Sequence, residues 1–582
     1  MSPRDSLDDL RTDTLSLDAG CPPPVSLHYA LSRQPSAKST AASVRAPSAH
    51  TADAAAAAPA AAAADASADP NADHSAPTSA KPVGLLSAIF LMVNRILGTG
   101  VFSTSSTILA QGGSVGISLI YWLIGGIIAA LGFAVYAEFA SAFPRNGGEL
   151  NYLQYVFRSP PFLVASMFAA QALLLGQAAG NANAAGQYFI HAAGGSTDAW
   201  NSKGIGVAIL CAALIVHGCF LRYGLLFQNA LGIFKVVILL LIVFAGFAAL
   251  AGHINVPDPR NFDNAFAGSR NDIYGVSQCI YNAVWSYVGY SNLFYALGEV
   301  RNPLRTIKIA GPLALISLTT LYVLAQVAYF AAVPREDILG SNQIIAALFF
   351  KNVFGDRSAR ALSVFVALSA VANVFAVLFA QGRLNQALGR DAIIPFSKFF
   401  ASNRPFNSPL AGLAWHTVVT LVLLLAPQQN AAYQFVLNLS SYPLNVINTA
   451  VGLALILAYL PAPLRPKCFH DWHPPFRASL PVATIFMLIS LFLVVAPWIP
   501  PPADEPASSL WYALAPAVSL GFFAAGACYW LVWYVILPRL FHYSLRHVES
   551  TLSDGTPISE FLIEKHSSEK ADALDSPTYS PA

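Results

Sequence analysis

The sequence predicts an all-α polytopic membrane protein of about twelve transmembrane helices, and three observations support this fold class. Of its 582 residues, 55% are hydrophobic and 11% are charged, whereas a soluble domain usually carries about 25% charged residues. The apolar residues gather in runs of about 20 or more, the length needed to cross a hydrocarbon core of about 30 Å. Lys and Arg are concentrated in alternate loops, as expected for loops on one side of a membrane.

The apolar runs begin at Val83 and predict twelve spans with mostly short connections. The predicted spans are 83–110, 115–142, 161–188, 204–221, 225–251, 274–298, 309–333, 359–384, 409–426, 432–460, 479–499 and 512–537. The long loop 334–358 contains an additional apolar segment, Ile344–Phe354, which predicts a helix of its own.

The membrane domain, 83–541, is flanked by two tails of different composition. Residues 1–82 are rich in Ala, Ser, Pro and Asp and have few large apolar side chains, so we expect a disordered tail. Residues 542–582 are predicted to form a C-terminal tail. The bias of Lys and Arg toward alternate loops predicts that both tails are cytoplasmic. Their lysines, among them Lys570, lie near many Ser and Thr residues, which is compatible with regulated turnover or with ordinary disordered tails.

Two spans are interrupted by glycine near their middle. Gly98-Thr99-Gly100 breaks the first span, and Gly289 lies within the polar and aromatic segment 286–292 of the sixth. Membrane helices tolerate glycine, so either site alone is ambiguous. The first and sixth spans occupy corresponding places if 83–251 and 274–460 are related halves, followed by two further helices in 479–541. Interrupted segments at matching positions indicate a transporter binding site.

The two breaks provide groups that suit a zwitterion. The half-helix that begins at Gly100 presents free N–H groups and a positive dipole end, which favour a carboxylate. Ser103 adds a hydroxyl to this half-helix. Exposed carbonyls in the sixth span can accept hydrogen bonds from an ammonium group. We expect Trp285, Tyr287 and Tyr290 to wall a side-chain pocket.

Three stretches of the sequence resemble a known family. They are NRILGTGVF, SYVGYSNLFYALGEVRNPLRTIKIAGPLAL and VANVFAVLFAQGRLNQALGRDAIIP. Here the chain resembles the amino acid–polyamine–organocation superfamily, and within it the L-type amino acid transporters and their fungal branch of high-affinity methionine permeases. The resemblance extends over about residues 83–540. It implies a five-plus-five inverted repeat, discontinuous first and sixth helices, alternating access and an amino acid substrate.

The resemblance also implies roles for individual residues. Gly98, Thr99 and Gly100 would bind the substrate carboxylate, and the backbone of the segment 287–289 would bind its amino group. Tyr290 stands where animal relatives carry tryptophan, so the size of the preferred substrate is open. The full predicted substrate-binding set is Gly98, Thr99, Gly100, Ser103, Trp285, Tyr287, Val288, Gly289, Tyr290 and Ser291. The loop 189–203 lacks the cysteine by which animal relatives bind a heavy chain, so we expect no disulfide-linked heavy chain.

Three charged residues within or beside the apolar runs are candidates for coupling or gating. An isolated cation in the membrane costs several kcal/mol, so Lys235 should face a cavity or lose its proton. The resemblance places Lys235 near the ion site of sodium-coupled relatives. Lys235 is therefore either a proton-coupling or ion-mimicking cation, or a side chain that reaches the cytoplasmic boundary of the membrane. Arg95 is an inner-gate or helix-packing residue, or a snorkelling side chain, and Glu299 is a candidate hinge partner. Asn181, Asn183 and Asn373 lie within predicted spans and either line the transport path or form hydrogen bonds between helices.

The remaining sequence features exclude several classes of function. The net charge of +2 gives no indication of nucleic-acid binding. No phosphate loop, metal-ligand spacing or paired catalytic carboxylates are evident, so we predict no cofactor and no enzymatic activity. The sequence predicts a secondary active permease of the plasma membrane, surrounded by lipid, that takes up neutral amino acids such as methionine with protons. A nutrient-sensing receptor on the same fold and an amino acid exchanger or uniporter remain alternatives.

Overall fold

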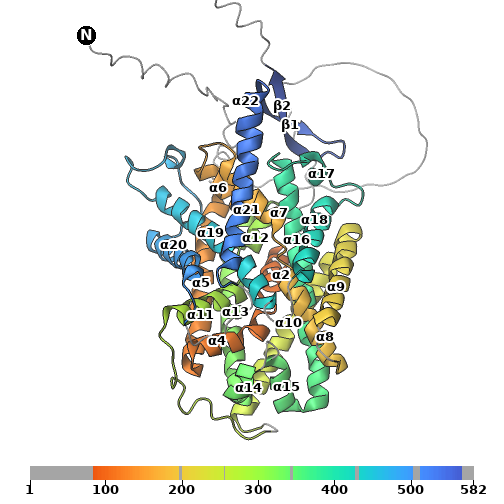
Figure 1. The fold of residues 1–582 in the computed structure, drawn as a ribbon, viewed down its shortest axis with the longest axis vertical. Helices are drawn as coiled ribbons and strands as arrows, with labels where there is room; N and C mark the ends of the chain where they lie inside the picture. Colours follow the sequence, from red (N-terminus) through yellow and green to blue (C-terminus); the bar gives the residue numbers. More distant parts are fainter. Residues whose placement is uncertain are drawn as a thin grey trace, which may run out of the picture. The chain divides into compact units, whose positions relative to one another are not determined.

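A computed structural model describes residues 83–195, 199–253, 256–340, 345–426, 432–502 and 511–565. These residues form a bundle of helices with a β-hairpin at one end, which we call the hairpin end (Figure 1). Helices α14 and α15 lie at the opposite end. The predicted disordered tail, 1–82, falls outside the described residues.

Ten helical segments in the described ranges, some with short interruptions, are long and apolar enough to cross a membrane, which confirms the predicted polytopic helical fold. They are Leu85–Ser103, Val115–Ala142, Leu163–Ala193, Trp200–Cys219, Leu221–Leu250, Pro303–Ala332, Asp356–Arg390, Phe435–Ala458, Leu480–Trp498 and Leu514–Leu540. The predicted ninth span appears as a shorter apolar helix, α18 (Leu410–Leu425), and the predicted sixth span is broken. The total of twelve spans and the inverted repeat stay predictions.

The first half of the bundle contains the first five predicted spans. Its helices are α2 (Leu85–Ile96), α3 (Gly100–Ser103), α4 (Ser105–Gly112), α5 (Val115–Ala142), α6 (Glu149–Val156), α7 (Leu163–Leu174), α8 (Ala179–Ala193), α9 (Ala199–Cys219) and α10 (Leu221–Leu250).

The second half begins with the sixth predicted span. Its helices are α11 (Ile273–Ser286), α12 (Asn292–Tyr295), η1 (Leu297–Glu299), α13 (Pro303–Ala332), α14 (Arg335–Gly340), α15 (Ile345–Phe354), α16 (Asp356–Arg390), α17 (Ser397–Ala401), α18 and α19 (Ala432–Ala458). Helix α15 confirms the prediction of a helix within the long loop. After the short η2 (Lys467–Phe469), the last helices are α20 (Leu480–Val495), η3 (Ala496–Trp498), α21 (Leu514–Trp530), the π-helical η4 (Leu531–Ile536) and α22 (Leu537–Leu540).

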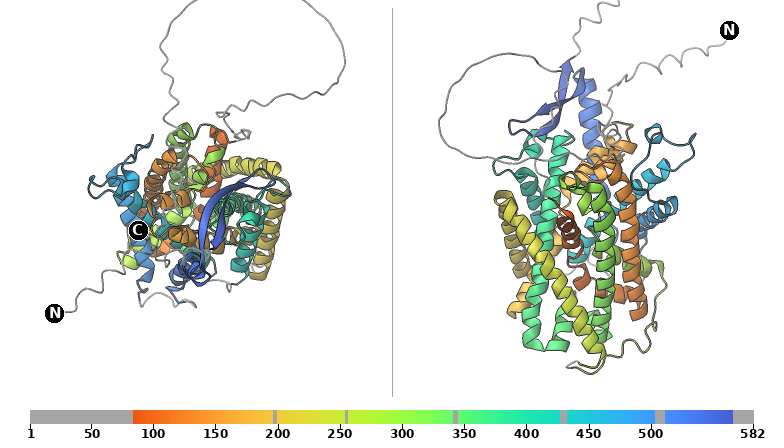
Figure 2. Two further views of the ribbon diagram at one scale, coloured as in Figure 1. Left: turned by 90° about the horizontal axis from the view of Figure 1, so that it is seen from above. Right: turned by 180° about the vertical axis from the view of Figure 1, so that it is seen from behind.

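The broken first span packs against α10, α13 and α16 (Figure 2). Glycines permit the close crossings around it, as is common between membrane helices. A Cβ atom on Gly246 of α10 would lie 2.1 Å from the Cβ of Ala328 of α13. On the other side of α13, a Cβ on Gly311 would lie 1.9 Å from the ring of Phe133 of α5. These crossings hold α10 and α5 against α13, beside the first span.

The predicted third span, 161–188, is not one continuous helix. Helix α7 ends at Leu174 and α8 begins at Ala179. Between them, a Cβ on Gly176 would lie 2.7 Å from the Cα of Thr420 in α18. The close approach of α18 to this glycine therefore accompanies a third break, which the sequence analysis did not predict.

The C-terminal tail predicted for 542–582 contains a β-hairpin. Strand β1 (Tyr543–Thr551) pairs antiparallel with β2 (Pro557–Lys565). At its turn, Asp554 accepts a hydrogen bond from the backbone N–H of Asn403 at 3.0 Å. Burial opposes ionisation of Asp554, but the hydrogen bonds from Asn403 and Thr556 prevail and lower its pKa to about 2. The turn is thus fixed to the loop that follows α17.

Candidate functional site

The first span is interrupted between Ile96, where α2 ends, and Gly100, where α3 begins. The end of α2 exposes carbonyl groups that a continuous helix would bond internally. Lys235 of α10 reaches them from the side. Its Nζ donates to the carbonyl oxygens of Asn94 at 2.9 Å and Leu97 at 2.6 Å. Only 1% of Lys235 is exposed, so this ammonium is held at the break inside the bundle.

Two further helices bond the same stretch of backbone. Asn373 of α16 donates through Nδ2 to the carbonyls of Asn94 at 3.2 Å and Arg95 at 2.7 Å. The hydroxyl of Tyr322 of α13 donates to the carbonyl of Ile96 at 2.9 Å. Each carbonyl from Asn94 to Leu97 therefore accepts a hydrogen bond from a side chain of another helix.

The glycine segment that follows is bonded from α8. The backbone N–H and the hydroxyl of Thr99 both donate to Oδ1 of Asn181, at 3.3 and 3.0 Å. A Cβ on Gly98 would lie 2.7 Å from Nδ2 of Asn373 and 3.1 Å from Oδ1 of Asn181. Glycine at 98 thus allows α8 and α16 to reach the break. At the start of α3, the N–H of Phe102 donates to the carbonyl of Thr99 at 3.0 Å, and those of Gly100 and Val101 have no intrahelical acceptor.

The sixth span is interrupted between Ser286, where α11 ends, and Asn292, where α12 begins. Gly289 adopts φ 126° within this segment, a conformation open to glycine but strained for other residues. A Cβ on Gly289 would lie 2.4 Å from Cγ of Arg95, and one on Gly100 would lie 2.7 Å from Cα of Ser286. The two breaks therefore lie directly against each other.

The three aromatic residues predicted to wall a pocket contact different helices. The hydroxyl of Tyr287 donates to the carbonyl of Trp122 of α5 at 3.1 Å. The hydroxyl of Tyr290 lies 3.3 Å from Oδ1 of Asn448 of α19. Trp285 belongs to an apolar cluster with residues of α5, α8, α19 and α20. These three rings therefore pack against helices around the sixth-span break, and their role as pocket walls stays a prediction.

The other predicted substrate-binding residues are at or beside the two breaks. Ser103 is the last residue of α3, and its buried hydroxyl has no hydrogen-bond partner within the described residues. Val288 precedes Gly289 and is partly buried. Ser291 is 8% exposed and precedes α12. The hydroxyl of Ser103 is therefore, like Oδ1 of Asn94 and Oδ1 of Asn373, an unpartnered polar atom beside the first-span break.

The predicted gating residues connect the two breaks to other helices. Arg95 is 7% exposed, and its Nη2 donates to Oε1 of Gln177 at 3.2 Å. Gln177 lies in the third-span break, so all three interrupted spans meet at Arg95. Glu299 of η1 forms an ion pair with Arg383 of α16 at 3.5 Å. The backbone N–H of Val83 also donates to the carbonyl of Glu299 at 3.2 Å, which joins the start of the first span to the end of the sixth.

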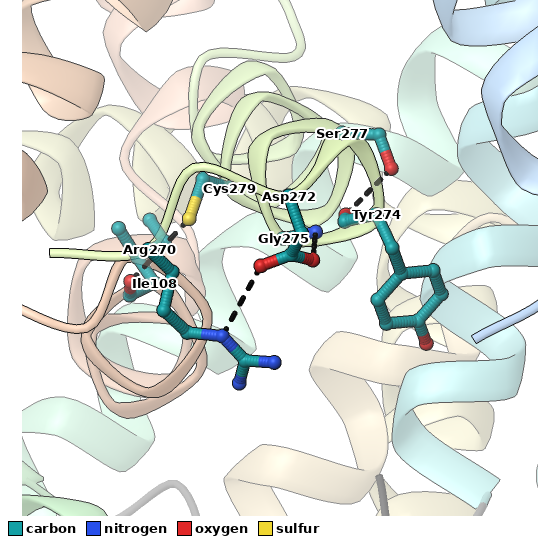
Figure 3. A network of polar contacts seen from close by, with 7 residues as sticks. All are labelled: Ile108, Arg270, Asp272, Tyr274, Gly275, Ser277 and Cys279. Atoms are coloured by element: carbon teal, nitrogen blue, oxygen red, sulfur yellow. Dashed lines mark hydrogen bonds and ion pairs between the residues drawn. The ribbon is translucent and has the colours of Figure 1, made fainter. Parts of the chain in front are cut away.

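At its other end, the sixth span begins against α4 (Figure 3). Asp272 caps α11 by accepting a hydrogen bond from the N–H of Gly275 at 2.7 Å, and it pairs with Arg270 at 3.2 Å. The thiol of Cys279 donates to the carbonyl of Ile108 of α4 at 3.4 Å. The first and sixth spans are therefore in contact beyond their breaks on this side as well.

Several residues of the site were not singled out from the sequence. Asn181 and Asn373 were recognised only as polar groups that either line a path or bond between helices, and the structure has both bonded to the first-span break. Tyr322 and Gln177 were not predicted. The available signal was the presence of amide and phenol groups within apolar spans, where unpaired polar groups are costly.

Comparison with known proteins identifies the family. Residues 83–536 match the family model described as amino acid permease. The chain belongs to the amino acid permease family. It is 45% identical over 478 residues to the high-affinity methionine permease of Saccharomyces cerevisiae, which covers 82% of this chain and 83% of the relative.

More distant relatives share the permease domain. The low-affinity methionine permease of Saccharomyces cerevisiae is 28% identical over 492 residues, 82% of this chain and 87% of the relative. The b(0,+)-type amino acid transporter 1 of Mus musculus is 28% identical over 436 residues, 73% of this chain and 84% of the relative. These matches confirm the predicted family and an integral membrane protein of amino acid transport rather than an enzyme.

Proposed function

We propose that this permease takes up methionine and similar neutral amino acids together with protons, by alternating access. The observation that carries this proposal is the meeting of the two breaks, in which Gly100 lies against Ser286 and Gly289 lies against Arg95. Interrupted backbone at membrane depth is tolerated where it is buried in protein or lines a cavity. The preference for methionine rests on the two methionine permeases of yeast among the relatives.

The breaks give the substrate two recognition sites of opposite polarity. The substrate carboxylate binds at the N-terminus of α3, where N–H groups and the helix dipole favour a negative charge. Ser103 donates its otherwise unpartnered hydroxyl to the same group. The substrate ammonium binds carbonyls released where α11 ends, near Val288. A neutral amino acid fits because the two sites match its carboxylate and its ammonium and provide no charged partner for its side chain.

Lys235 acts as a fixed cation in this mechanism. Its ammonium binds the carbonyls of Asn94 and Leu97, the type of oxygen ligands that bind a metal ion in broken transporter helices. Arg95 and Glu299 form the gate at the end where Val83 joins the first span to the sixth and Arg383 of α16 pairs with Glu299. Transport requires these contacts to break and re-form. The termini lie in the cytoplasm and the protein resides in the plasma membrane.

The test is transport by the purified full-length protein in lipid vesicles. Labelled methionine should accumulate when an inward proton gradient is imposed, and unlabelled neutral amino acids should compete. A potential supplies about 2.3 kcal/mol per charge per 100 mV, enough for about a 50-fold gradient. Uptake only against internal amino acid would indicate an exchanger. Uptake that never exceeds equilibrium would indicate a uniporter, and binding without flux a receptor.

A further inference from the structure

Glu149 is a buried carboxylic acid that the proposed mechanism does not use. It is the first residue of α6, in the connection between α5 and α7, and only 1% of it is exposed. Its Oε1 accepts a hydrogen bond from the hydroxyl of Tyr295 at 2.9 Å. Its Oε2 is buried and has no hydrogen-bond partner among the described residues. One oxygen of this carboxyl is therefore tied to the sixth span, and the other is free to carry a proton.

The segment around Glu149 holds the second half of the sixth span. Oδ1 of Asn146 accepts a hydrogen bond from the backbone N–H of Gly298 at 2.8 Å. A Cβ on Gly148 would lie 2.9 Å from the ring of Tyr295. Together with the bond from Tyr295 to Glu149, these contacts fix α12 and η1 against residues 146–149. Any movement of that half-helix changes the surroundings of the carboxyl.

The carboxyl faces phenols and a hydroxyl rather than cations. No ion pair to Glu149 forms within the described ranges. Two arginines act on neighbours of Glu149, namely Arg145 on Tyr152 and Arg95 on Tyr295. The titratable groups around it are Tyr136 of α5, Tyr152 of α6, and Tyr290 and Tyr295 of the sixth span.

These surroundings favour the protonated form of Glu149. Burial raises the pKa of Glu149 to about 7, and its own N–H and the hydroxyls of Tyr295, Tyr136 and Ser291 oppose this rise without overcoming it. Because the pKa in this conformation is raised, opening of the site to water lowers it toward the ordinary value of about 4.3 and releases the proton.

Glu138, another buried glutamate nearby, is bonded very differently. Its carboxylate accepts hydrogen bonds from the indole of Trp472 at 2.9 Å, the hydroxyl of Tyr459 at 2.8 Å and the N–H of Ala478 at 2.7 Å. Such donors satisfy an ionised carboxylate. Both oxygens of Glu138 therefore have donors, whereas Oε2 of Glu149 has none among the described residues.

A network of hydroxyls connects Glu149 to the sixth-span break. Tyr290, which directly follows Gly289, and Tyr136 both bond to Oδ1 of Asn448, at 3.3 and 2.6 Å. The hydroxyls of Tyr136 and Ser291 also lie beside the carboxyl of Glu149. Polar groups thus extend from the break to the carboxyl without a charged residue between them.

We propose that Glu149 is the residue that carries the coupled proton. The proton binds Oε2 while the sixth span is held against 146–149. It reaches the carboxyl from the break by way of the Ser291 and Tyr136 hydroxyls. When α12 and η1 move away, water enters, the O–H bond breaks and the proton leaves to water on the side of α6. This inference rests on the proposed proton-coupled uptake.

The first test replaces Glu149→Gln, which mimics the protonated acid but cannot release a proton. In vesicles, we expect this variant to exchange labelled for unlabelled methionine across the membrane, because exchange needs no net proton movement. We expect accumulation driven by a proton gradient to be lost. Glu564→Gln, which alters an exposed glutamate of β2, is the control and should keep both activities.

Two further variants separate proton binding from a structural role. Glu149→Asp retains a carboxyl group and should retain gradient-driven accumulation. Tyr295→Phe removes a hydrogen bond that favours the carboxylate, so the pKa of Glu149 should rise. Since loading requires the protonated acid, the pH midpoint of uptake should then shift to higher pH.

The outcomes distinguish a failure of this inference from a failure of the proposed function. If the unsubstituted protein does not accumulate methionine with protons, the proposed function fails. If it does, but Glu149→Gln still accumulates methionine, Glu149 is not the proton carrier. Loss of exchange together with accumulation in Glu149→Gln, or an unmoved pH midpoint in Tyr295→Phe, likewise overturns the inference.

Discussion

The two interrupted spans are stabilised in different ways. At the first-span break, side chains from α10, α13 and α16 bond each carbonyl from Asn94 to Leu97. At the sixth-span break, the chain bonds mainly to itself, through Tyr287 N–H to Val284, Val288 N–H to Trp285 and Asn292 N–H to Gly289 at 3.0–3.1 Å.

Because of this difference, the two breaks should be sensitive to substitutions at different residues. The first depends on polar side chains far away in sequence, so it should be disrupted by substitutions on other helices. The second depends on the backbone of Gly289, so it should be disrupted by substitution of that glycine itself. The first break is therefore held by its surroundings and the second by its own conformation.

Among the substitutions that test this comparison, Lys235→Ala should have the largest effect on stability and uptake. The substitution leaves the buried carbonyl of Leu97 without its side-chain donor and leaves that of Asn94 with Asn373 alone. An unsatisfied buried group of this kind costs about 1–3 kcal/mol. We expect the melting temperature to fall and methionine uptake to be lost. Lys351→Ala, which alters a lysine with a 56% exposed side chain, is the control and should change neither. Full uptake by Lys235→Ala would mean that the first break does not depend on α10.

Glycine substitutions should have a smaller effect. The order of their stability losses tests whether the sixth-span break depends on its own backbone. Gly289→Ala combines a φ of 126° with a Cβ position 2.4 Å from Arg95, so strain alone costs about 1–3 kcal/mol. Gly98→Ala meets only the ends of the Asn373 and Asn181 side chains, which can shift.

Gly521→Ala serves as the matched control for these two variants, because a Cβ at this position in α21 meets nothing within 4 Å. Thermal unfolding of the three variants should rank the loss of stability as Gly289 first, Gly98 second and Gly521 unaffected. If Gly98→Ala proved the most damaging, the first break would depend on its own backbone more than on its surroundings.

The smallest effect is expected from Tyr322→Phe. It removes one hydrogen bond to the carbonyl of Ile96 and keeps the ring contact with Tyr287, whose centroid lies 5.0 Å away. Loss of a single hydrogen bond costs about 1 kcal/mol, so uptake should decrease while the protein stays folded. Uptake equal to that of the unsubstituted protein would show that Lys235 and Asn373 suffice to hold the break.

The sequence predicted the features that depend on local pattern. Apolar runs located the membrane helices, and Gly98, Gly100 and Gly289 located both breaks, because glycine in an apolar helix is itself a visible signal. It could not predict which distant side chains bond a break. Asn181 and Asn373 were ambiguous for that reason, since their partners are fixed by helix packing. The burial of Glu149 in a connecting segment likewise depends on where Tyr295 lies in space.

Other misses had a signal that went unused. Asp554-Gly555 separates two stretches of alternating apolar and polar residues, a pattern that favours a hairpin. Gly176 and Gln177 lie in the middle of a predicted span, as Gly98 and Gly289 do, and the third break occurs there. Glycine followed by a polar residue in a membrane span was therefore informative in three places, of which two were recognised.

The C-terminal hairpin fixes where the remainder of the chain starts. Because β2 runs antiparallel to β1, Lys565 lies opposite Tyr543, near the end of α22. The hairpin is also bonded to the membrane domain, through Asp554 to Asn403 and through Glu560 to Lys398 of α17 at 3.0 Å. Truncation before Tyr543 would therefore remove partners of Asn403 and Lys398 as well as the tail itself, and its effect on transport could not be assigned to the tail alone.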